Sequence, residues 1–252
     1  MKRLLLSVTI LISLSCSHKP TEPVPELSTQ NTAVCILTFD DGYASVYYLA
    51  KPLMDSLGFK GNCFVICGQV CPDEPNSKGP TDSVRWGDKP CDKMTWHQIE
   101  SLHTDGWNIY NHGWNHLIFP DSSDINSCYS CLKEKGFNAN VFAYPAGLYD
   151  EKTVNLVKLN HIAGRTTDPG LEDNLNSYVL RGYYVKTQTP LDTVKSWIDL
   201  AITQRKLLIL IFHGFCTKTN KETKNILNLQ SFKYILQYLS ENQNLIKVET
   251  FQ

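Results

Sequence analysis

Two adjacent carboxylates stand directly after the first strand that the sequence predicts. The segment Thr38–Gly42 reads Thr-Phe-Asp-Asp-Gly and overlaps the end of the apolar run Val34–Phe39. Neighbouring carboxylates at a strand end repel each other unless a cation lies beside them. Asp40 and Asp41 therefore indicate a cation-binding site at this strand end.

Two histidines four residues apart follow a later predicted strand. Trp107–Tyr110 runs directly into a turn that contains His112 and His116. Two imidazoles at this spacing can converge on one metal ion. The pair therefore predicts a metal site.

Two further predicted strands end in residues suited to chemistry. Leu207–Phe212, the strongest strand signal in the chain, is followed by His213. The predicted strand Val141–Tyr144 overlaps the start of the segment Phe142–Gly147, which continues beyond its end. Each feature is common by itself, but their shared position at strand ends predicts one site. The histidines without that context, which we expect on the surface or in packing, are His97, His103 and His161.

The elements that must position these residues alternate along the chain. Strands are predicted at Val34–Phe39, Cys63–Ile66, Trp107–Tyr110, Val141–Tyr144 and Leu207–Phe212, and Ile246–Phe251 closes the chain. Further strands or strand-like segments are predicted at His161–Gly164 and Tyr178–Val185. Helices are predicted at Val46–Leu57, Trp96–Leu102 with Thr95 as its N-cap, Cys128–Lys135, Glu151–Leu159, Leu191–Gln204 and Phe232–Glu241. This alternation predicts an α/β domain with a parallel sheet covered by helices. A β/α barrel fits better than an open sheet, and barrel active sites lie where the strands end.

The composition is that of a folded protein with one large domain. Of the 252 residues, 42% are apolar and 19% are charged, which excludes a disordered chain. The formal net charge is −1 and no basic stripe is visible, so a nucleic-acid partner is not expected.

The first 31 residues predict export and a membrane anchor. Met1–Arg3 is basic, and the apolar run Leu4–Ser15 is too short to span a bilayer, which is typical of a signal peptide. The small residues before Cys16 resemble a bacterial lipobox. We therefore predict a signal peptide at 1–15, a flexible tether at 16–31 that begins with lipidated Cys16, and one domain at 32–252. The predicted location is the bacterial cell envelope, with the lipid anchor as the only membrane contact; ordinary secretion is the alternative.

Nine cysteines suit an exported chain, in which disulfides can form. Cys71 and Cys91 flank a polar stretch that they could close as a loop. Cys128 and Cys131 form a Cys-x-x-Cys pair, which predicts a local bridge or two free thiols. The cysteines within apolar runs, which we expect to be buried, are Cys35 and Cys63.

From Ala33 to the C-terminus, the chain resembles the NodB-type polysaccharide deacetylases, carbohydrate esterase family four. Thr38–Gly42 matches the family motif Thr-Phe-Asp-Asp-Gly residue for residue. His112–His116 matches its His-x-x-x-His motif, with Gly113 where the family usually has Ser or Thr. The resemblance implies a deformed (β/α)7 barrel with one divalent metal ion.

Two more segments carry the resemblance. Phe142–Gly147 resembles the Phe-Ala-Tyr-Pro-Tyr-Gly segment of one branch of the family, with Ala146 in place of the second Tyr. Ile211–His213 corresponds to a final Leu-x-His motif. The resemblance thus extends over nearly the whole predicted domain.

The resemblance implies a role for each candidate residue. Asp41, His112 and His116 would bind the metal, for which zinc is expected and nickel, cobalt and iron are alternatives. Asp40 would be the general base and His213 the general acid.

Two further roles complete the implied site. The backbone N–H of Ala146 would stabilise the oxyanion, which a main-chain donor can do whatever its side chain. The family's usual third motif contains an arginine that orients the base, and this chain has none there. Arg181 is either its substitute from a later strand or a surface arginine.

The implied activity is metal-dependent hydrolysis of acetyl groups from an acetylated polysaccharide or oligosaccharide. The substrate would be an N-acetyl hexosamine glycan or acetylated xylan, so the bond cleaved would be an acetamide C–N bond or an acetyl ester. The alternative is a non-catalytic glycan-binding lipoprotein on the same fold. A serine hydrolase is not supported, because the chain has no Gly-x-Ser-x-Gly segment.

Overall fold

The computed structural model describes residues 32–73, 92–217 and 226–251. The strands are β1 (Ala33–Phe39), β2 (Asn62–Val65), β3 (Asn108–Asn111), β4 (Val141–Ala143), β5 (Ala163–Arg165), β6 (Tyr183–Tyr184), β7 (Leu207–Phe212), β8 (Gly214–Cys216), β9 (Ile226–Asn228) and β10 (Ile246–Glu249). The helices are α1 (Lys51–Ser56), α2 (Trp96–Thr104), α3 (Ser122–Glu134), α4 (Glu151–Val157), α5 (Leu191–Gln204) and α6 (Leu229–Glu241). Short helical turns lie at η1 (Val46–Ala50), η2 (Cys67–Gln69) and η3 (Pro145–Gly147).

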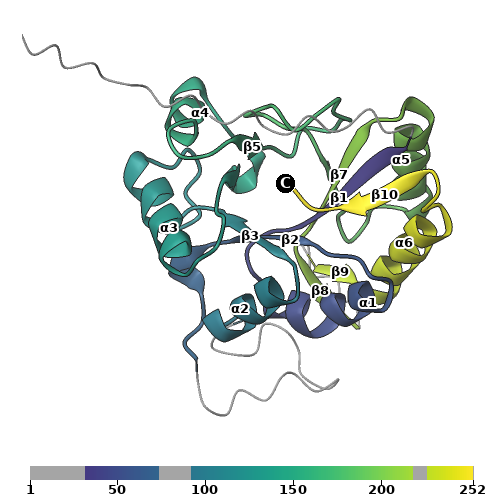
Figure 1. Cartoon of the computed structure of the whole chain (residues 1–252), viewed down its shortest axis with the longest axis horizontal. Helices are drawn as coiled ribbons and strands as arrows, with labels where there is room; N and C mark the ends of the chain where they lie inside the picture. Colours follow the sequence, from purple (N-terminus) through teal and green to yellow (C-terminus); the bar gives the residue numbers. More distant parts are fainter. Residues whose placement is uncertain (1–31, 74–91, 218–225, 252) are drawn as a thin grey trace, which may run out of the picture.

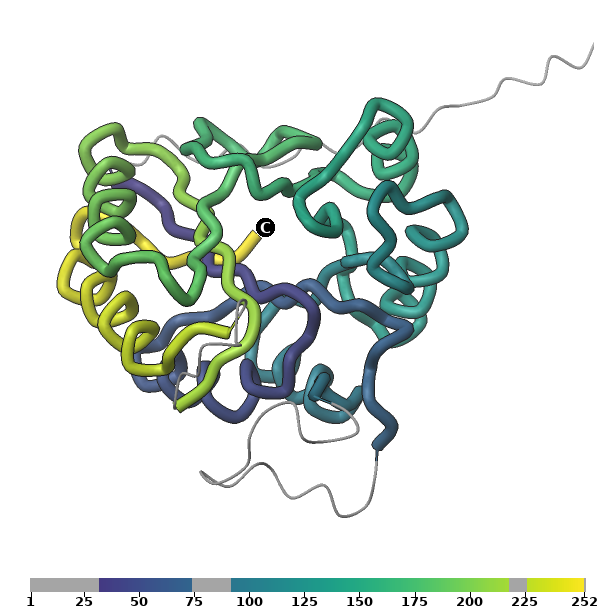
Figure 2. Tube along the Cα trace, turned by 180° about the vertical axis from the view of Figure 1, so that it is seen from behind, coloured from purple at the N-terminus to yellow at the C-terminus, as the bar shows by residue number. Residues whose placement is uncertain are grey.

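The main sheet is parallel and curls into a deformed β/α barrel, as the sequence predicts. Its strands run in the order β5-β4-β3-β2-β1-β7-β6, and β10 also pairs with β1. The helices lie around the outside of the curled sheet, with α3 and α6 on opposite sides of the molecule (Figures 1 and 2). Parallel strands place all their carboxyl ends at one end of the barrel.

Strand β1 is buried on both faces, which explains its unbroken apolar sequence. Val34 and Ile36 belong to the cluster inside the barrel, together with Ile209 of β7. Cys35 and Leu37 alternate with them and belong to the cluster that also contains side chains of the outer helices. Cys35 and Cys63 are buried and unpaired, which confirms the prediction for them.

The segment Leu180–Tyr184 spans the gap between the two ends of the curled sheet. Leu180 forms a parallel bridge to Arg165 of β5, and β6 pairs with β7. Only Tyr183 and Tyr184 are in a strand here, so the predicted strand Tyr178–Val185 is too long. The chain must leave β5 before it reaches β7, which prevents continuous pairing with either strand.

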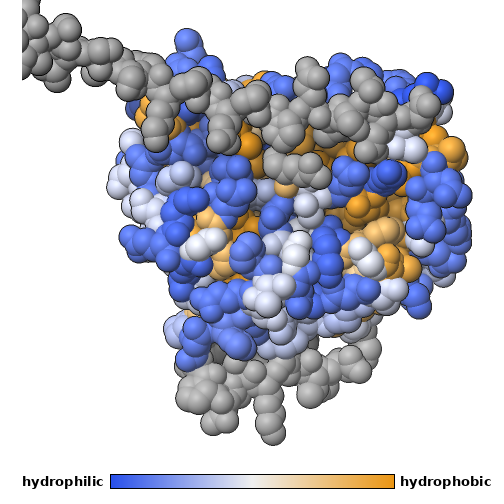
Figure 3. Space-filling view, in the orientation of Figure 1, coloured by the Kyte–Doolittle hydropathy of each residue, from blue (hydrophilic) through white to orange (hydrophobic). Residues whose placement is uncertain are grey.

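The C-terminal segment closes the opposite end of the barrel. Phe251 donates its N–H to Asn62 Oδ1 at 3.1 Å and accepts hydrogen bonds from Asn108 Nδ2 at 2.6 Å and the Tyr110 hydroxyl at 3.1 Å. The C-terminal end lies near the middle of the view in Figure 1. The space-filling view from the same side shows polar side chains interspersed with apolar patches (Figure 3), which is ordinary for a protein surface.

Two helix starts show how local sequence sets the boundaries. Thr95 caps α2 in a reciprocal capping box with Gln98, which confirms the predicted N-cap. Helix α3 begins at Ser122, six residues before the predicted start, because Asp121 caps a polar first turn without an apolar pattern. The short parallel pair β8–β9 was not predicted at all.

The disulfides differ in part from the sequence prediction. Cys128 pairs with Cys67, while Cys131 is a free thiol, so neither a local bridge nor two free thiols is correct. Cys71 is disulfide-bonded, but its predicted partner Cys91 lies outside the described residues. The predicted signal peptide and tether also lie outside them. None of the helices in the described ranges combines the length and apolar character needed to cross a bilayer.

Candidate metal centre

Three predicted metal ligands lie together at the carboxyl end of the sheet. Asp41 follows β1, and His112 and His116 follow β3; one ligand atom from each lies within 4.8 Å of the other two. Asp41 Oδ1 is 3.4 Å from His112 Nε2 and 3.5 Å from His116 Nε2. Asp41 Oδ1 is also buried without a hydrogen-bond partner, which is the arrangement expected of a ligand atom. One carboxylate and two imidazoles fit a hydrolytic metal that keeps open coordination positions.

A hydrogen bond from Nδ1 to the neighbouring strand β4 fixes the orientation of the His112 ring. His112 Nδ1 lies 2.8 Å from the carbonyl oxygen of Ala143 in β4, to which it donates. This contact leaves the lone pair on Nε2, which faces Asp41. Metal-binding histidines generally have such an acceptor behind them, because it sets the ring orientation and the tautomer.

The charges of the three groups suit a cation. Burial by itself would raise the pKa of the Asp41 carboxyl, but the His112 imidazole and other nearby cationic groups hold it well below its usual range. Burial and the neighbouring His112 lower the pKa of His116. A charged carboxylate and a neutral imidazole are the forms that bind metal.

The backbone at the centre is strained in several places. Asp41, His116 and Ala146 have φ angles of 70°, 60° and 56°, in the left-handed region that non-glycine residues rarely adopt. Such conformations persist only where the surrounding structure enforces them, and they concentrate at functional sites. Ala146 is exposed in η3, directly after β4, and its proposed N–H contact to an oxyanion stays a prediction.

Asp40 is paired with an arginine that sequence reasoning did not select. Arg165 Nη2 lies 2.5 Å from Asp40 Oδ1, and both side chains are buried. Arg165 ends β5, one residue beyond the predicted strand His161–Gly164, and its guanidinium lies 5.0 Å from the centre of the Phe64 ring. The position at a strand end was the available signal, but nothing in the sequence connects Arg165 to Asp40.

Arg181 does not contact Asp40, so the expectation that it replaces the orienting arginine is wrong. Its side chain is 48% exposed, and its Nε donates to Glu172 Oε1 at 2.8 Å. It also donates to the carbonyl oxygen of Leu171. Arg181 is therefore the surface arginine of the two alternatives.

His213 lies beside this pair, at the end of β7. It is partly buried, its Nδ1 has no hydrogen-bond partner in the described residues, and its ring centre is 4.7 Å from that of Tyr184. Burial lowers the pKa of His213, although Asp40 and Asp41 oppose the shift. His213 therefore provides an imidazole with an unpaired Nδ1 at the carboxyl end of the sheet.

The other three histidines among the described residues lie where we expected them. His97 and His103 are exposed. His161 is buried and packs against the rings of Tyr129 and Phe142. None of these three belongs to the metal centre.

The comparisons with known proteins show the family of this chain. The sequence model of the polysaccharide deacetylase family matches residues 28–163, more than half of the chain. The chain belongs to the polysaccharide deacetylase family. No curated protein sequence matches it.

Solved deacetylase structures share the fold. A carbohydrate esterase family four domain of a xylanase, from the hindgut metagenome of Trinervitermes trinervoides, is 14% identical with a TM-score of 0.52 over 86% of this chain and 87% of that one. A de-N-acetylase from Aggregatibacter actinomycetemcomitans is also 14% identical, with a TM-score of 0.52 over 64% and 73% of the two chains. A Streptococcus pyogenes deacetylase solved with acetate is 22% identical with a TM-score of 0.47, and the match covers 58% of this chain and 63% of that one. At these identities the likeness shows the fold alone.

Proposed function

We propose that this protein is a metal-dependent hydrolase that removes acetyl groups from an acetylated polysaccharide or oligosaccharide. The observation that carries the proposal is the grouping of Asp41, His112 and His116 beside the Asp40–Arg165 pair. A chain of the polysaccharide deacetylase family that keeps a metal-ligand set, a second carboxylate and a nearby imidazole has the groups that hydrolysis needs. Both acetamide and ester substrates fit this proposal.

The metal would be held by Asp41, His112 and His116, with zinc as the expected ion. When bound there, a divalent ion polarises the acetyl carbonyl and makes water a better nucleophile. The open positions of a three-ligand site leave room for water and substrate.

The proton transfers fall to two side chains of the protein. Asp40 would accept the proton of the attacking water, and Arg165 holds this carboxylate in one direction. His213 would protonate the leaving nitrogen or oxygen. The N–H of Ala146 would donate to the oxyanion that forms from the carbonyl.

Metal content and acetate release together test the proposal. We expect the wild-type chain to bind one zinc ion and to release acetate from at least one member of a panel of acetylated glycans, and chelation to abolish that release. His112→Ala and His116→Ala should lose metal and activity together. His97→Ala is the matched control, because His97 is exposed and outside the metal centre. Glycan binding without acetate release from the zinc-loaded protein would instead favour the non-catalytic alternative.

We also propose that the protein is exported and anchored to a bacterial membrane through lipidated Cys16. The Cys67–Cys128 disulfide supports export, because such bonds persist mainly in oxidising compartments. We expect the full chain to fractionate with membranes and Cys16→Ser to be released. A Cys16→Ser protein that stays membrane-bound would contradict the anchor.

A further inference from the structure

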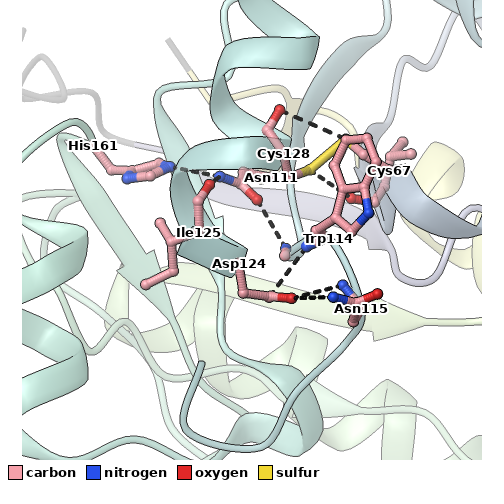
Figure 4. Close-up of a disulfide and its surroundings, with 10 residues drawn as sticks. Cys67, Asn111, Trp114, Asn115, Asp124, Ile125, Cys128 and His161 are labelled. Carbon is pink, nitrogen blue, oxygen red and sulfur yellow. Dashed lines mark hydrogen bonds between the residues drawn. A yellow bond between two sulfur atoms is a disulfide. The ribbon is translucent and has the colours of Figure 1, made fainter. Parts of the chain in front are cut away.

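One buried carboxylate contacts the loop that joins the two histidine ligands. Asp124 lies in the first turn of α3 and is 4% exposed. Its Oδ2 accepts a hydrogen bond from the N–H of Trp114 at 3.1 Å, and its Oδ1 accepts from the N–H of Asn115 at 2.8 Å and from Asn115 Nδ2 at 3.1 Å. Figure 4 shows the Asp124 carboxylate directed at this loop. Trp114 and Asn115 stand between His112 and His116, so Asp124 binds the stretch that separates the ligands.

Gly113 leaves the space that this carboxylate occupies. A Cβ at position 113 would lie 2.5 Å from Asp124 Oδ2, and the φ of Gly113 is +80°. Any side chain at this position would thus collide with Asp124. Asp124 can therefore lie here only because position 113 is Gly, where the family usually has Ser or Thr.

Asp124 is itself held firmly in place. The Asp121 side chain caps α3 by accepting the N–H of Asp124 at 2.9 Å. One turn further along the helix, Cys128 forms the disulfide with Cys67. Gly68, next to Cys67, donates its N–H to the carbonyl oxygen of Trp114 at 2.9 Å. The loop is therefore bound from two sides by segments that are covalently joined to each other (Figure 4).

We propose that Asp124 is the positioning residue of the metal loop, and that its charged hydrogen bonds to Trp114 and Asn115 direct His116 towards Asp41. The inference rests on the proposed metal site. His116 has a left-handed backbone, which costs about 1–2 kcal/mol and requires support from its surroundings. Hydrogen bonds to a charged carboxylate are about twice as strong as neutral ones, so Asp124 is suited to give that support.

Zinc binding in Asp124→Asn and Asp124→Ala tests the proposal. We expect the zinc dissociation constant to rise about 10- to 100-fold in both variants, the range typical of lost supporting contacts. In metal-free protein, we expect the backbone amide of Asn115 to exchange hydrogen faster, whereas the amide of Trp114 keeps the main-chain oxygen of Asp124 as an acceptor at 3.2 Å. Asp124→Asn keeps the shape of the side chain, so the test stands even if Asp124→Ala does not fold.

Asn228→Ala is the matched control. Asn228 caps α6, and its side chain accepts the N–H of Gln230 at 2.8 Å, so its loss weakens a helix start on the opposite side of the molecule. This variant should lose stability but keep the zinc affinity and the exchange rate at Asn115. Wild-type zinc affinity in both folded Asp124 variants would overturn the proposal, as would an equal loss in Asn228→Ala. If wild-type protein bound no zinc, the proposed function would fail, while unchanged exchange at Asn115 in the Asp124 variants would separately refute the role of Asp124.

Discussion

The two ends of the barrel differ in which buried polar groups lack hydrogen-bond partners. At the carboxyl end, buried atoms without hydrogen-bond partners in the described residues include Asp41 Oδ1, His213 Nδ1 and the Tyr184 hydroxyl. At the opposite end, the unpaired atoms among the described residues include Trp107 Nε1 and Asn140 Oδ1, neither of which titrates. The side chain of Asn62 at that end is fully used: it accepts from Phe251 and donates to the carbonyl oxygen of Leu37 at 3.1 Å. An unpaired buried polar group costs about 1–3 kcal/mol, whereas a paired one contributes to stability. The open end therefore has unpaired carboxylate and imidazole atoms that can bind a metal or transfer a proton, whereas the unpaired indole and amide atoms at the closed end cannot transfer one.

Left-handed backbone occurs at both ends of the barrel. The left-handed residues Asp41, His116 and Ala146 all lie in segments that follow the carboxyl ends of strands. Ala139 and Arg205, two residues before β4 and β7 at the other end, also have a φ of 54°, and Arg205 is the C-cap of α5. Strained backbone therefore coincides with the proposed metal and substrate site but is not confined to that end.

The largest effect should come from Asp40→Asn at the open end. We expect acetate release to fall by about 10²- to 10⁴-fold, because an amide cannot accept the proton of water. Zinc content should stay at the wild-type level, since Asp40 is not one of the three grouped ligands. Loss of zinc together with activity would show that Asp40 also supports metal binding, so that the two aspartates do not have the separate roles proposed.

Phe251→Ala should have a large effect on stability and little on catalysis. The Phe251 ring lies 5.7 Å from that of Tyr110 and 6.1 Å from that of Phe64, and its burial is nearly complete. Removing a buried phenylalanine costs about 3–5 kcal/mol. Urea unfolding should measure this loss, while acetate release per zinc-loaded molecule stays within a few-fold of wild type. A drop in acetate release as large as that expected for Asp40→Asn would mean that the C-terminal segment supports catalysis as well as stability.

His161 should make stability depend on pH. Burial lowers its pKa from 6.5 to about 4. Between these values the unfolded chain takes up a proton that the folded chain does not, so acid favours unfolding. The contribution of neutral His161 to the free energy of unfolding is complete above the pKa of the unfolded state. Up to about 3 kcal/mol of it is lost as the pH falls through the pKa of the folded state. Urea unfolding at several pH values should show a flatter profile for His161→Gln than for wild type, and identical slopes would contradict this role.

Arg181→Ala should have the smallest effect. Its exposed ion pair with Glu172 contributes about 0–1 kcal/mol. Acetate release should be unchanged, because Arg165 and not Arg181 contacts Asp40. Arg165→Met, which leaves Asp40 unpaired and buried, should instead reduce both stability and activity. A loss of activity in Arg181→Ala alone would reverse this assignment.

Local sequence predicts the elements well where one residue pattern decides them. Helix α5 and strand β7 have the predicted bounds, because a strong apolar period or run is bounded by proline or a polar residue. The metal ligands were found because each motif is short and stands at a strand end. Arg165 was missed because its partner Asp40 is 125 residues away, and Asp124 because a carboxylate in a first helical turn is ordinary by itself. Tertiary contacts, which no local pattern contains, determine both roles.

The pairing of β1 bears on the order in which the protein can be completed during synthesis. Residues 33–36 of β1 pair with residues 246–249 of β10, and the whole of β1 from Val34 onward pairs with β7. The strand that leaves the ribosome first therefore stays unpaired along one edge until β7 is made, and part of its other edge waits for the last residues of the chain. Closing so long a loop is slow, since its entropy must be lost before the contacts form. A ribosome-bound chain that ends before residue 246 should thus remain sensitive to protease, and resistance should arise only when the final strand is free to join.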